Sequence, residues 1–446
     1  MRVLVIGLAG TGEAVVVDAR ANGNTVVVLE DHPTGDAYAA RAVRAQALGA
    51  EVVERPSPDA VRERVAWADL VVPSPGVRPD HPAITAAIAA GVPVRAEIDL
   101  AVERLAARVP APQVVAVTGT NGKTTVTSMI AAMCDASGRS SVAVGNIGRP
   151  LIDAVEDDVD VVVAEVSTFQ LEFTTTAFAP QVAVLLNVAQ DHIDWHGSVE
   201  AYALAKAKVF THQHDDQVAV VNIDDPTTRA LARNAPGRIV ACSRVDDGAD
   251  YVVAHDTIRG PGDVAVKLPA FRAAHDVDNA LAATAAALEV GASAPSIEAT
   301  LAAWTTLPHR VELVATIGGV DFVDDSKATN AHATASALDG LEHVVLLAGG
   351  RDRSRNLDTL RPYATHLKFV VAIGEAAPTV ESVFADVVPV VRAGSMHDAV
   401  RKAAARAEPG DTVLLSPACA SFDWYSSYAE RGDDFAHEVH TLRGEQ

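Results

Sequence analysis

Short valine-rich apolar runs alternate with longer alanine-rich stretches from one end of the chain to the other. The runs include Val26–Leu29, Leu70–Val72, Val114–Val117, Val159–Ala164, Val182–Leu186 and Val344–Leu347. A strand that is buried on both faces gives such a continuous run, and helices between strands allow neighbouring strands to lie parallel. The pattern therefore predicts an α/β protein with doubly wound, mainly parallel sheets that bind ligands at the carboxyl ends of their strands.

The chain of 446 residues is longer than one hydrophobic core normally serves. At about 150 residues per domain, three domains are expected. Prolines mark seams at residues 108–112 and 307–310, and a helix from about Glu97 to Ala107 should pack with the residues after it. We predict domains over residues 1–95, 96–306 and 307–446, a helix around Trp304 and a polar surface excursion at residues 246–261.

Composition and charge narrow the class of protein. The chain is 49% hydrophobic and 21% charged, which is typical of a globular protein, and its net charge of -22 argues against nucleic acid or an anionic membrane as a partner. The 3 cysteines are irregularly spaced, which favours neither a disulfide framework nor a zinc site. The run Met1–Ile6 is typical of a strand and not of a signal peptide. No apolar run is long enough to span a bilayer, so we expect a cytoplasmic protein.

A glycine-containing loop follows the apolar run Val114–Val117. Its glycines allow successive backbone N–H groups to point inward, the helix that follows contributes partial positive charge, and Lys123 can reach terminal phosphates. A full phosphate-loop motif would have glycine at Val117, so only the second half matches. A glycine turn with a surface lysine is the alternative, which the flanking strand and helix make less favourable. The predicted phosphate-binding residues are Gly119, Thr120, Asn121, Gly122, Lys123, Thr124 and Thr125, with the Thr124 hydroxyl as a Mg²⁺ ligand.

Further chemistry-bearing residues follow the next two apolar runs. Glu165 ends one run, where a carboxylate is well placed to ligate Mg²⁺. Asn187 ends the next run, and Asp191 and His192 follow it. Taken singly, His192 is more often a structural histidine. Lys206, on a helix beginning near Ser198, is more often an exposed lysine with a packed stem.

Taken in order, the loop, Glu165, Asn187, His192 and Lys206 resemble the central ATPase domain of the Mur ligases and the related folylpolyglutamate synthetases. The resemblance implies that ATP binds with two Mg²⁺ ions. It also implies that Lys206 is carbamylated and holds the second ion together with Glu165 and His192. The central domain would then be an ATP-binding phosphate-loop domain, flanked by two Rossmann-like domains.

The resemblance continues through His275 and Asn279, before an alanine-rich helix, then through Leu307–Arg310 and Asp324–Asn330. Asp276 stands where the family usually has asparagine. The implied roles are adenine contact for Asn279, γ-phosphate contact for Arg310, ribose contact for Asp325, and contact with the phosphoryl group or incoming amino acid for Lys327.

Towards the end of the chain, Ser416–Asp423, Tyr428 and Glu430–Gly432 match the part of the family that binds an acidic amino acid. The implied D-glutamate contacts are Thr329, Ser421, the backbone around Tyr428 and Arg353. The family often has lysine where Arg353 stands, and arginine differs from lysine in hydrogen-bond geometry.

The N-terminal turn Gly7–Gly12 suggests a dinucleotide-binding fold, but Ala9 replaces the second glycine of that motif, which weakens a dehydrogenase interpretation. The resemblance instead implies that the turn binds uridine diphosphate. The implied UDP-sugar contacts are Gly10, Thr11, Glu30, Asp31, Ser74 and Gly76, with Asn146 and Gln170 reaching the sugar-linked portion.

The resemblance as a whole implies a monomeric, cytoplasmic, ATP-dependent amide ligase of peptidoglycan precursor synthesis. Its substrates would be UDP-N-acetylmuramoyl-L-alanine, D-glutamate and ATP, and the reaction would pass through an acyl phosphate. One alternative is a relative that adds glutamate to folate, against which the N-terminal region and Ser416–Asp423 count. Another is an ATP-driven switch without ligase activity, in which Glu165 and Lys206 would be structural.

Overall fold

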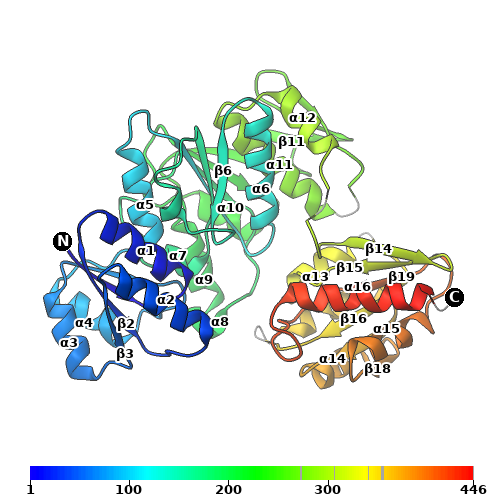
Figure 1. The fold of residues 1–446 in the computed structure, drawn as a ribbon. Helices are drawn as coiled ribbons and strands as arrows, with labels where there is room; N and C mark the ends of the chain where they lie inside the picture. The colour runs from blue at the N-terminus through cyan, green and yellow to red at the C-terminus, as the bar shows by residue number, and fades with distance from the viewer. Residues whose placement is uncertain (272–273, 306, 340, 353–355, 445–446) are drawn as a thin grey trace. The chain divides into compact units, whose positions relative to one another are not determined.

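The computed structural model describes residues 1–271, 274–305, 307–339, 341–352 and 356–444 (Figure 1). The chain divides into two compact units. The first comprises Met1–Val188, Ala203–Pro269 and Asp278–Ala302, and the second comprises Ala189–Tyr202, Ala270–Val277 and Ala303–Gln446. Within the described residues, helices long and apolar enough to cross a membrane are absent.

The first sheet is parallel and has the strand order β3-β2-β1-β4. Its strands are β1 (Arg2–Ile6), β2 (Thr25–Glu30), β3 (Glu51–Glu54) and β4 (Leu70–Pro73), and the helices nearby in sequence are α1 (Gly10–Ala21), α2 (Asp36–Ala47), α3 (Pro58–Trp67), α4 (Pro82–Ala90) and α5 (Glu97–Ala106). Val3 and Val5 of β1 enter one hydrophobic core, and Leu4 and Ile6 enter a second. Because successive side chains of a strand face opposite ways, the sheet is buried on both faces.

The second sheet has nine strands in the order β13-β12-β11-β10-β9-β8-β5-β7-β6. The strands from β6 to β11 are parallel, and β12 and β13 are antiparallel to their neighbours. Their bounds are β5 Gln113–Thr118, β6 Ser141–Gly145, β7 Val161–Glu165, β8 Val182–Leu185, β9 Val218–Asn222, β10 Arg238–Ser243, β11 Tyr251–Ala254, β12 Thr257–Gly260 and β13 Val264–Lys267. The prediction of a surface excursion at residues 246–261 was therefore wrong, because Tyr251 and Ile258 are buried and extend the sheet.

The helices of this part of the chain differ from the sequence predictions at two places. Their bounds are α6 Lys123–Ala136, η1 Leu151–Ala154, α7 Thr168–Leu171, α8 Ile193–His196, α9 Val199–Ala207, α10 Pro226–Ala232, α11 Ala274–Glu289 and α12 Ala294–Ala302. His275 and Asn279 lie inside α11, and Asp276 in its first turn favours that early start. α12 ends before Trp304, where β-branched Thr305 and the later Pro308 disfavour helix.

The third sheet, in the second unit, has the order β14-β15-β19-β16-β17-β18. β14 (Glu312–Ile317) and β15 (Val320–Asp324) form an antiparallel pair, and the other strands are parallel to their neighbours. The remaining bounds are β16 Val344–Gly349, β17 Leu367–Ile373, β18 Val390–Arg392, β19 Thr412–Leu415, α13 Ala331–Leu338, η2 Leu357–His366, α14 Ala377–Phe384, α15 Met396–Ala404 and α16 Tyr428–Gly444. α16, red in Figure 1, packs against β14, β15 and α15.

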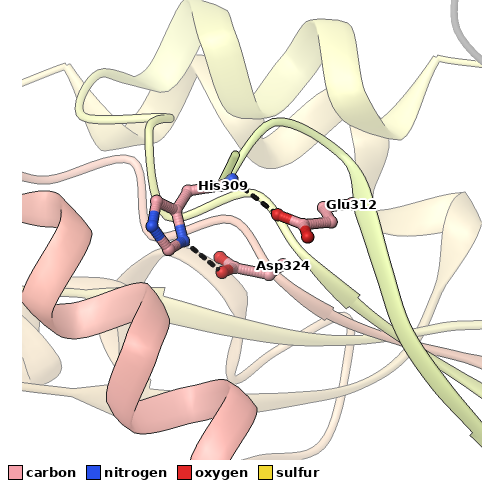
Figure 2. Close-up of side chains that lie close together, drawn as sticks. All are labelled: His309, Glu312 and Asp324. Carbon is pink, nitrogen blue, oxygen red and sulfur yellow. Dashed lines mark hydrogen bonds and ion pairs between the residues drawn. The ribbon is translucent and has the colours of Figure 1, made fainter. Parts of the chain in front are cut away.

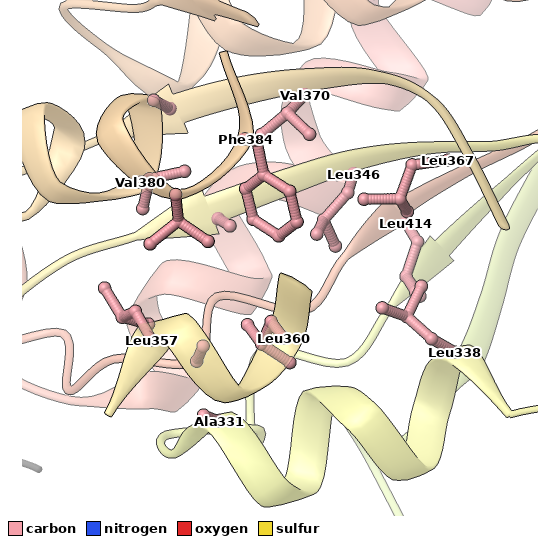
Figure 3. Packing of buried hydrophobic residues seen from close by; sticks show 14 of the residues in the cluster. Ala331, Leu338, Leu346, Leu357, Leu360, Leu367, Val370, Val380, Phe384 and Leu414 are labelled. Atoms are coloured by element: carbon pink, nitrogen blue, oxygen red, sulfur yellow. The ribbon is translucent and has the colours of Figure 1, made fainter. Parts of the chain in front are cut away.

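One hydrophobic core of this unit lies between the sheet, α13, η2 and α14, where Phe384 packs among Leu346, Val370 and Val380 (Figure 3). The opposite face of the sheet has its own buried cluster. The predicted α/β class with mainly parallel sheets is thus confirmed. The three sheets use residues 2–73, 113–267 and 312–415, and the domain boundaries near residues 95 and 306 stay predictions.

Phe384 provides a test of this core because its side chain is only 1% exposed. We expect Phe384→Ala to lower the unfolding free energy of the C-terminal unit by about 3–5 kcal/mol, since it removes buried apolar surface and leaves a cavity. Val387→Ala, at a side chain 49% exposed just after α14, should change it by less than about 0.5 kcal/mol. Scanning calorimetry measures both, and equal shifts in the two variants would contradict the packing described.

Candidate active site

The loop between β5 and α6 is fastened by hydrogen bonds to its own backbone and to Asn187. The Nζ of Lys123 donates to the carbonyl oxygens of Gly119 and Thr120, both at 2.9 Å. The Oδ1 of Asn187 accepts from the Asn121 N–H at 2.9 Å, and its backbone carbonyl accepts from the Thr120 N–H at 2.9 Å. Asn187 emerges from β8, the strand next to β5, so the adjacent strand fixes the curvature of the loop.

Two loop positions leave no room for a side chain. Gly122 has a φ of 85°, and a Cβ there would lie 2.3 Å from Oδ1 of Asn279. A Cβ on Gly119 would lie 2.9 Å from the Cβ of Leu186. Asn279, the predicted adenine contact, is therefore packed directly beside the loop, with only 5% of its surface exposed.

The carboxylate of Glu165 is held at the end of β7. It is 3% exposed, and its two oxygens accept hydrogen bonds from the Thr124 hydroxyl and from Nδ2 of Asn146, both at 2.8 Å. The structure thus brings into contact Thr124 and Glu165, which were each predicted as Mg²⁺ ligands. Asn146 was predicted to contact the sugar-linked portion of the substrate, and here it orients this carboxylate. Hydroxyl and carboxylate oxygens are the donors that Mg²⁺ prefers.

Lys206 is buried near the end of α9 at 2% exposure, so its interpretation as an exposed lysine is wrong. A lysine is almost never fully buried unless it is paired. Lys208, two residues further on, has 34% of its side chain exposed and forms an ion pair of 3.2 Å with Glu172.

His192 belongs to the second compact unit, whereas Glu165 and Lys206 belong to the first. His192 precedes α8 with a left-handed φ of 51°. Its backbone N–H donates to Oδ1 of Asp191 at 2.9 Å, and its Nε2 lies 3.7 Å from Oδ2 of the same residue. Its role as a metal ligand stays a prediction.

In the second unit, the residues predicted to contact nucleotide lie around the end of β15. Oδ2 of Asp325 accepts from the Ser416 hydroxyl at 2.7 Å. Burial raises the pKa of Asp325 to about 7, and the Ser416 hydrogen bond and the charge of Arg310 act in the opposite direction. The Nζ of Lys327 lies 3.9 Å from the centre of the Tyr428 ring, a distance typical of a cation–π contact.

Three of the predicted D-glutamate contacts lie on different segments: Thr329 in the loop after β15, Ser421 after β19, and Tyr428 at the start of α16. Thr329 is exposed, Ser421 is 2% exposed, and the Tyr428 carbonyl accepts from the Ser326 hydroxyl at 2.7 Å. Arg353 lies outside the described residues.

Arg431 supports this region and was not among the predicted site residues. It is 1% exposed, and its guanidinium donates to the Ser326 hydroxyl at 2.9 Å, the Ser326 carbonyl at 2.7 Å and the Cys419 carbonyl at 3.0 Å. Burial lowers its pKa to about 10. Arg431 therefore ties the start of α16 to the loop after β15, through Ser326, and to the segment after β19, through Cys419. The Glu430–Gly432 motif was a signal for it, but its burial depends on contacts distant in sequence.

The N-terminal turn gathers the ends of β1, β2 and β4. Glu30 accepts from the backbone N–H groups of Leu8 at 2.7 Å and His32 at 2.9 Å, and the Ser74 hydroxyl donates to the Gly7 carbonyl at 2.7 Å. Asp31 lies 2.8 Å from His81. Gly10 and Thr11 open α1, and Gly76 follows β4 with a φ of 91°. The predicted UDP contacts therefore share one edge of the sheet, where Glu30 and Ser74 also shape the turn.

Gln170 is turned into the protein. It is 4% exposed, and its Oε1 accepts from the backbone N–H and hydroxyl of Ser167 at 3.0 and 2.9 Å, which caps α7. Nearby Glu97 is 2% exposed, and burial raises its pKa to about 7, although hydrogen bonds from Ile152 and Gln170 oppose the shift. The contact of Gln170 with a sugar stays a prediction.

A parallel sheet, a glycine loop that opens a helix and a carboxylate at the adjacent strand end define a phosphate-loop protein of the α/β class. Two family descriptions match the chain, "Mur ligase middle domain" over residues 117–287 and "Mur ligase, glutamate ligase domain" over residues 309–419. The chain belongs to the Mur ligase family.

Among its relatives, the UDP-N-acetylmuramoylalanine–D-glutamate ligase of Frankia casuarinae is 42% identical over 99% of this chain and 94% of that protein. The protein of the same name from Thermobifida fusca is 41% identical over 99% of both chains.

Solved structures share the fold at lower identity. The MurF ligase from Thermotoga maritima in complex with ADP has a TM-score of 0.63 and 19% identity, covering 98% of this chain and 95% of that one. The pseudomurein peptide ligase type C from Methanothermus fervidus has a TM-score of 0.62 and 16% identity over 99% of both chains.

The crowding at Gly122 leads to a test of the loop. Gly122→Ala should weaken ADP or ATP binding by about tenfold or more, because alanine is strained at this φ and its Cβ would displace Asn279. Gly138→Ala is a matched control, since Gly138 has a φ of 76° but open space around it. Titration calorimetry with Mg²⁺ and nucleotide measures both affinities. Equal affinities in the two variants would show that the loop does not bind phosphate.

Proposed function

We propose that this chain joins D-glutamate to UDP-N-acetylmuramoyl-L-alanine and converts ATP to ADP and phosphate in the process. The observation that carries the proposal is the phosphate loop with Thr124 bonded to Glu165. This loop occurs in a chain that is 36–42% identical, over 99% or more of its length, to relatives named for D-glutamate ligation. The reaction is a cytoplasmic step of peptidoglycan precursor synthesis, where ATP is available, and a monomer suffices for it.

The chemistry needs an activated carboxyl group. An oxygen of the alanyl carboxylate attacks the γ-phosphorus of ATP, the bond from that phosphorus to the bridging oxygen breaks, and ADP leaves. The D-glutamate amine then attacks the carbonyl carbon of the acyl phosphate and loses a proton. Inorganic phosphate departs with the former carboxylate oxygen, and an amide bond remains. Fixed positive groups favour both steps because negative charge gathers on the transferred phosphoryl group and on the tetrahedral intermediate.

The cations proposed for this task are Lys123, Arg310 and Lys327. The ammonium of Lys123 donates to the carbonyl oxygens of Gly119 and Thr120, so it lies beside the backbone of the phosphate loop. Lys327 is held over the Tyr428 ring, and Arg310 precedes β14. Asn279 and Asp325 are proposed to contact the adenine and ribose.

The donor set around the loop fits Mg²⁺. The Thr124 hydroxyl and the Glu165 carboxylate already lie within hydrogen-bond distance, and both are oxygen donors. We propose that they hold one ion, and that His192 and a carbamate on buried Lys206 help to hold a second together with Glu165. Bound Mg²⁺ would neutralise charge on the phosphates. A carbamate changes a buried cation into a carboxylate, which removes the ammonium charge from the protein interior.

The other substrates are assigned to the other two sheets. Gly10, Thr11, Glu30, Asp31, Ser74 and Gly76 are proposed to bind the UDP portion, with Asn146 and Gln170 towards the sugar. Thr329, Ser421, the Tyr428 backbone and Arg353 are proposed to bind D-glutamate. The D-glutamate assignment rests on resemblance and on the closeness of Tyr428 to Lys327.

A ligase that adds glutamate to a folate is the nearer alternative. A solved chain of that kind, E. coli FolC in complex with ADP and without folate substrate, covers 78% of this chain at 20% identity and a TM-score of 0.57. The relatives named for D-glutamate cover 99%. An ATP-driven switch is the more distant alternative, and the burial of Lys206 together with the Thr124–Glu165 pair favours catalysis over a structural role.

An amino-acid panel tests substrate and reaction together. With ATP, Mg²⁺ and UDP-N-acetylmuramoyl-L-alanine, phosphate release should require D-glutamate, because only the amine completes the reaction. L-glutamate, D-aspartate and no amino acid are the controls, and dihydropteroate with L-glutamate tests the folate alternative. Equal release with L-glutamate or with no amino acid would contradict the assignment, and release without either acid or amine would indicate a switch.

Lys206 provides a second test. Lys206→Ala should lower kcat by about 100-fold or more because it removes a proposed metal-binding group. Lys208→Ala, two residues away at a partly exposed ion pair, should leave kcat within about twofold. In wild-type protein equilibrated with ¹³C-bicarbonate, a carbamate signal should appear by NMR and disappear in Lys206→Ala. Unchanged activity in Lys206→Ala would refute the carbamate role.

A further inference from the structure

His309 lies in the turn before β14 and holds two segments through its backbone. Its φ of 62° is in the left-handed region, which histidine adopts more readily than most residues. Its N–H donates to Oε2 of Glu312 at 2.9 Å, and its carbonyl accepts from the Lys327 N–H at 3.1 Å. Arg310 is the next residue. The turn that carries Arg310 and the loop that carries Lys327 are therefore directly bonded to each other.

The ring of His309 makes a second connection to the same loop. Figure 2 shows the His309 ring facing Asp324. The Nδ1 of His309 lies 2.7 Å from Oδ2 of Asp324, and Oδ1 of Asp324 accepts from the Ser326 N–H at 2.8 Å. Asp324 is 1% exposed, so both of its oxygens need such partners. Because Asp325 follows immediately, the His309–Asp324 bond also fixes the direction in which Asp325 leaves β15.

α16 closes over this bond. A Cβ on Gly432 would lie 2.2 Å from Nδ1 of His309 and 2.6 Å from Oδ2 of Asp324, so only glycine allows the helix to approach this closely. The His309 ring also lies 6.3 Å from the Tyr428 ring, the same ring that carries the Lys327 ammonium. His309 therefore contacts the turn, the loop and the helix.

We propose that His309 is a positioning residue that holds Arg310, Asp325 and Lys327 in one fixed arrangement for nucleotide binding and phosphoryl transfer. The inference rests on the proposed function, since these three residues have assigned roles there. His309 itself is not assigned a contact with substrate. It acts through two hydrogen bonds to the Asp324–Lys327 loop and through its peptide link to Arg310.

His309, Glu312 and Asp324 together have the composition of a cation site. Each offers one ligand atom, and these three atoms lie within 4.8 Å of one another. Hydrogen bonds already engage each of them. Glu312 accepts from the His309 N–H, and Asp324 accepts from the ring and from Ser326. These bonds account for the arrangement without an ion, so positioning is the better-supported role.

The test compares His309→Ala, His309→Asn and a matched control. Asparagine tolerates left-handed backbone, and its amide can replace the Nδ1 donor, whereas alanine removes the donor. His343→Ala is the control, because His343 has a φ of 57° in the same unit and is exposed. For each variant, kcat, KM for ATP, ADP affinity by calorimetry and Tm are measured.

His309→Ala should raise KM for ATP and weaken ADP binding by about tenfold, with a lower kcat as well. His309→Asn should stay within about threefold of wild type, and His343→Ala should match wild type in KM. The positioning role is wrong if His309→Ala lowers only kcat, in proportion to the loss of folded protein. It is also wrong if His309→Ala and His309→Asn show the same KM for ATP and the same ADP affinity. Stoichiometric zinc in the purified protein that His309→Ala removes would also overturn it.

Failure of this inference can be distinguished from failure of the proposed function. A wild-type protein that shows no D-glutamate-dependent turnover contradicts the proposed function. ADP affinity does not depend on the amino acid, so the comparison of His309→Ala with His309→Asn still decides the role of His309. A wild-type protein that turns over normally, with unchanged nucleotide affinity in His309→Ala, contradicts the inference alone.

Discussion

Parallel strands that end at one edge of a sheet bring together side chains far apart in sequence, and the phosphate-loop site depends on that alignment. Val117 of β5 is in register with Glu165 of β7 and with Val184 of β8. The loop, the carboxylate and Asn187 therefore emerge side by side. Each then fixes another, since Asn187 holds the loop and Thr124 bonds to Glu165. The strand interiors are apolar, so the side chains proposed for chemistry lie at the strand ends or just after them.

The same constraint shapes the other two sheets. In the first, Glu30 and Ser74 follow or end neighbouring strands and both bond to the turn after β1. In the third, Asp324 is in register with Leu415, so Asp325 and Ser416 emerge next to each other and form a hydrogen bond. Glycine also allows a helix to approach such an edge closely, as Gly432 of α16 does next to His309 and Asp324.

The sequence was most informative where one continuous apolar run predicts one buried strand. The apolar runs predicted buried strands of the sheets, and the strand-to-helix context predicted α6. Thr124 and Glu165 were each predicted as Mg²⁺ ligands, and strand ends of a parallel sheet share an edge, which explains their contact. The sequence could not show the inward turn of Gln170, the burial of Lys206 and Arg431, or the role of His309, since these depend on contacts between distant segments. Strands β11 and β12 were missed because they bury few side chains. The helix predicted around Trp304 ends earlier, at Ala302, because Thr305 and Pro308 disfavour helix.

In the proposed reaction, the chain activates a carboxylate by phosphorylation and then forms an amide. The most direct measurement follows oxygen from UDP-N-acetylmuramoyl-L-alanine labelled with ¹⁸O at both oxygens of the alanyl carboxylate. During turnover with ATP and D-glutamate, the released phosphate should carry one ¹⁸O and the new amide should retain the other, as mass spectrometry would show. Unlabelled phosphate, with both ¹⁸O atoms left in the acid, would contradict an acyl-phosphate ligase.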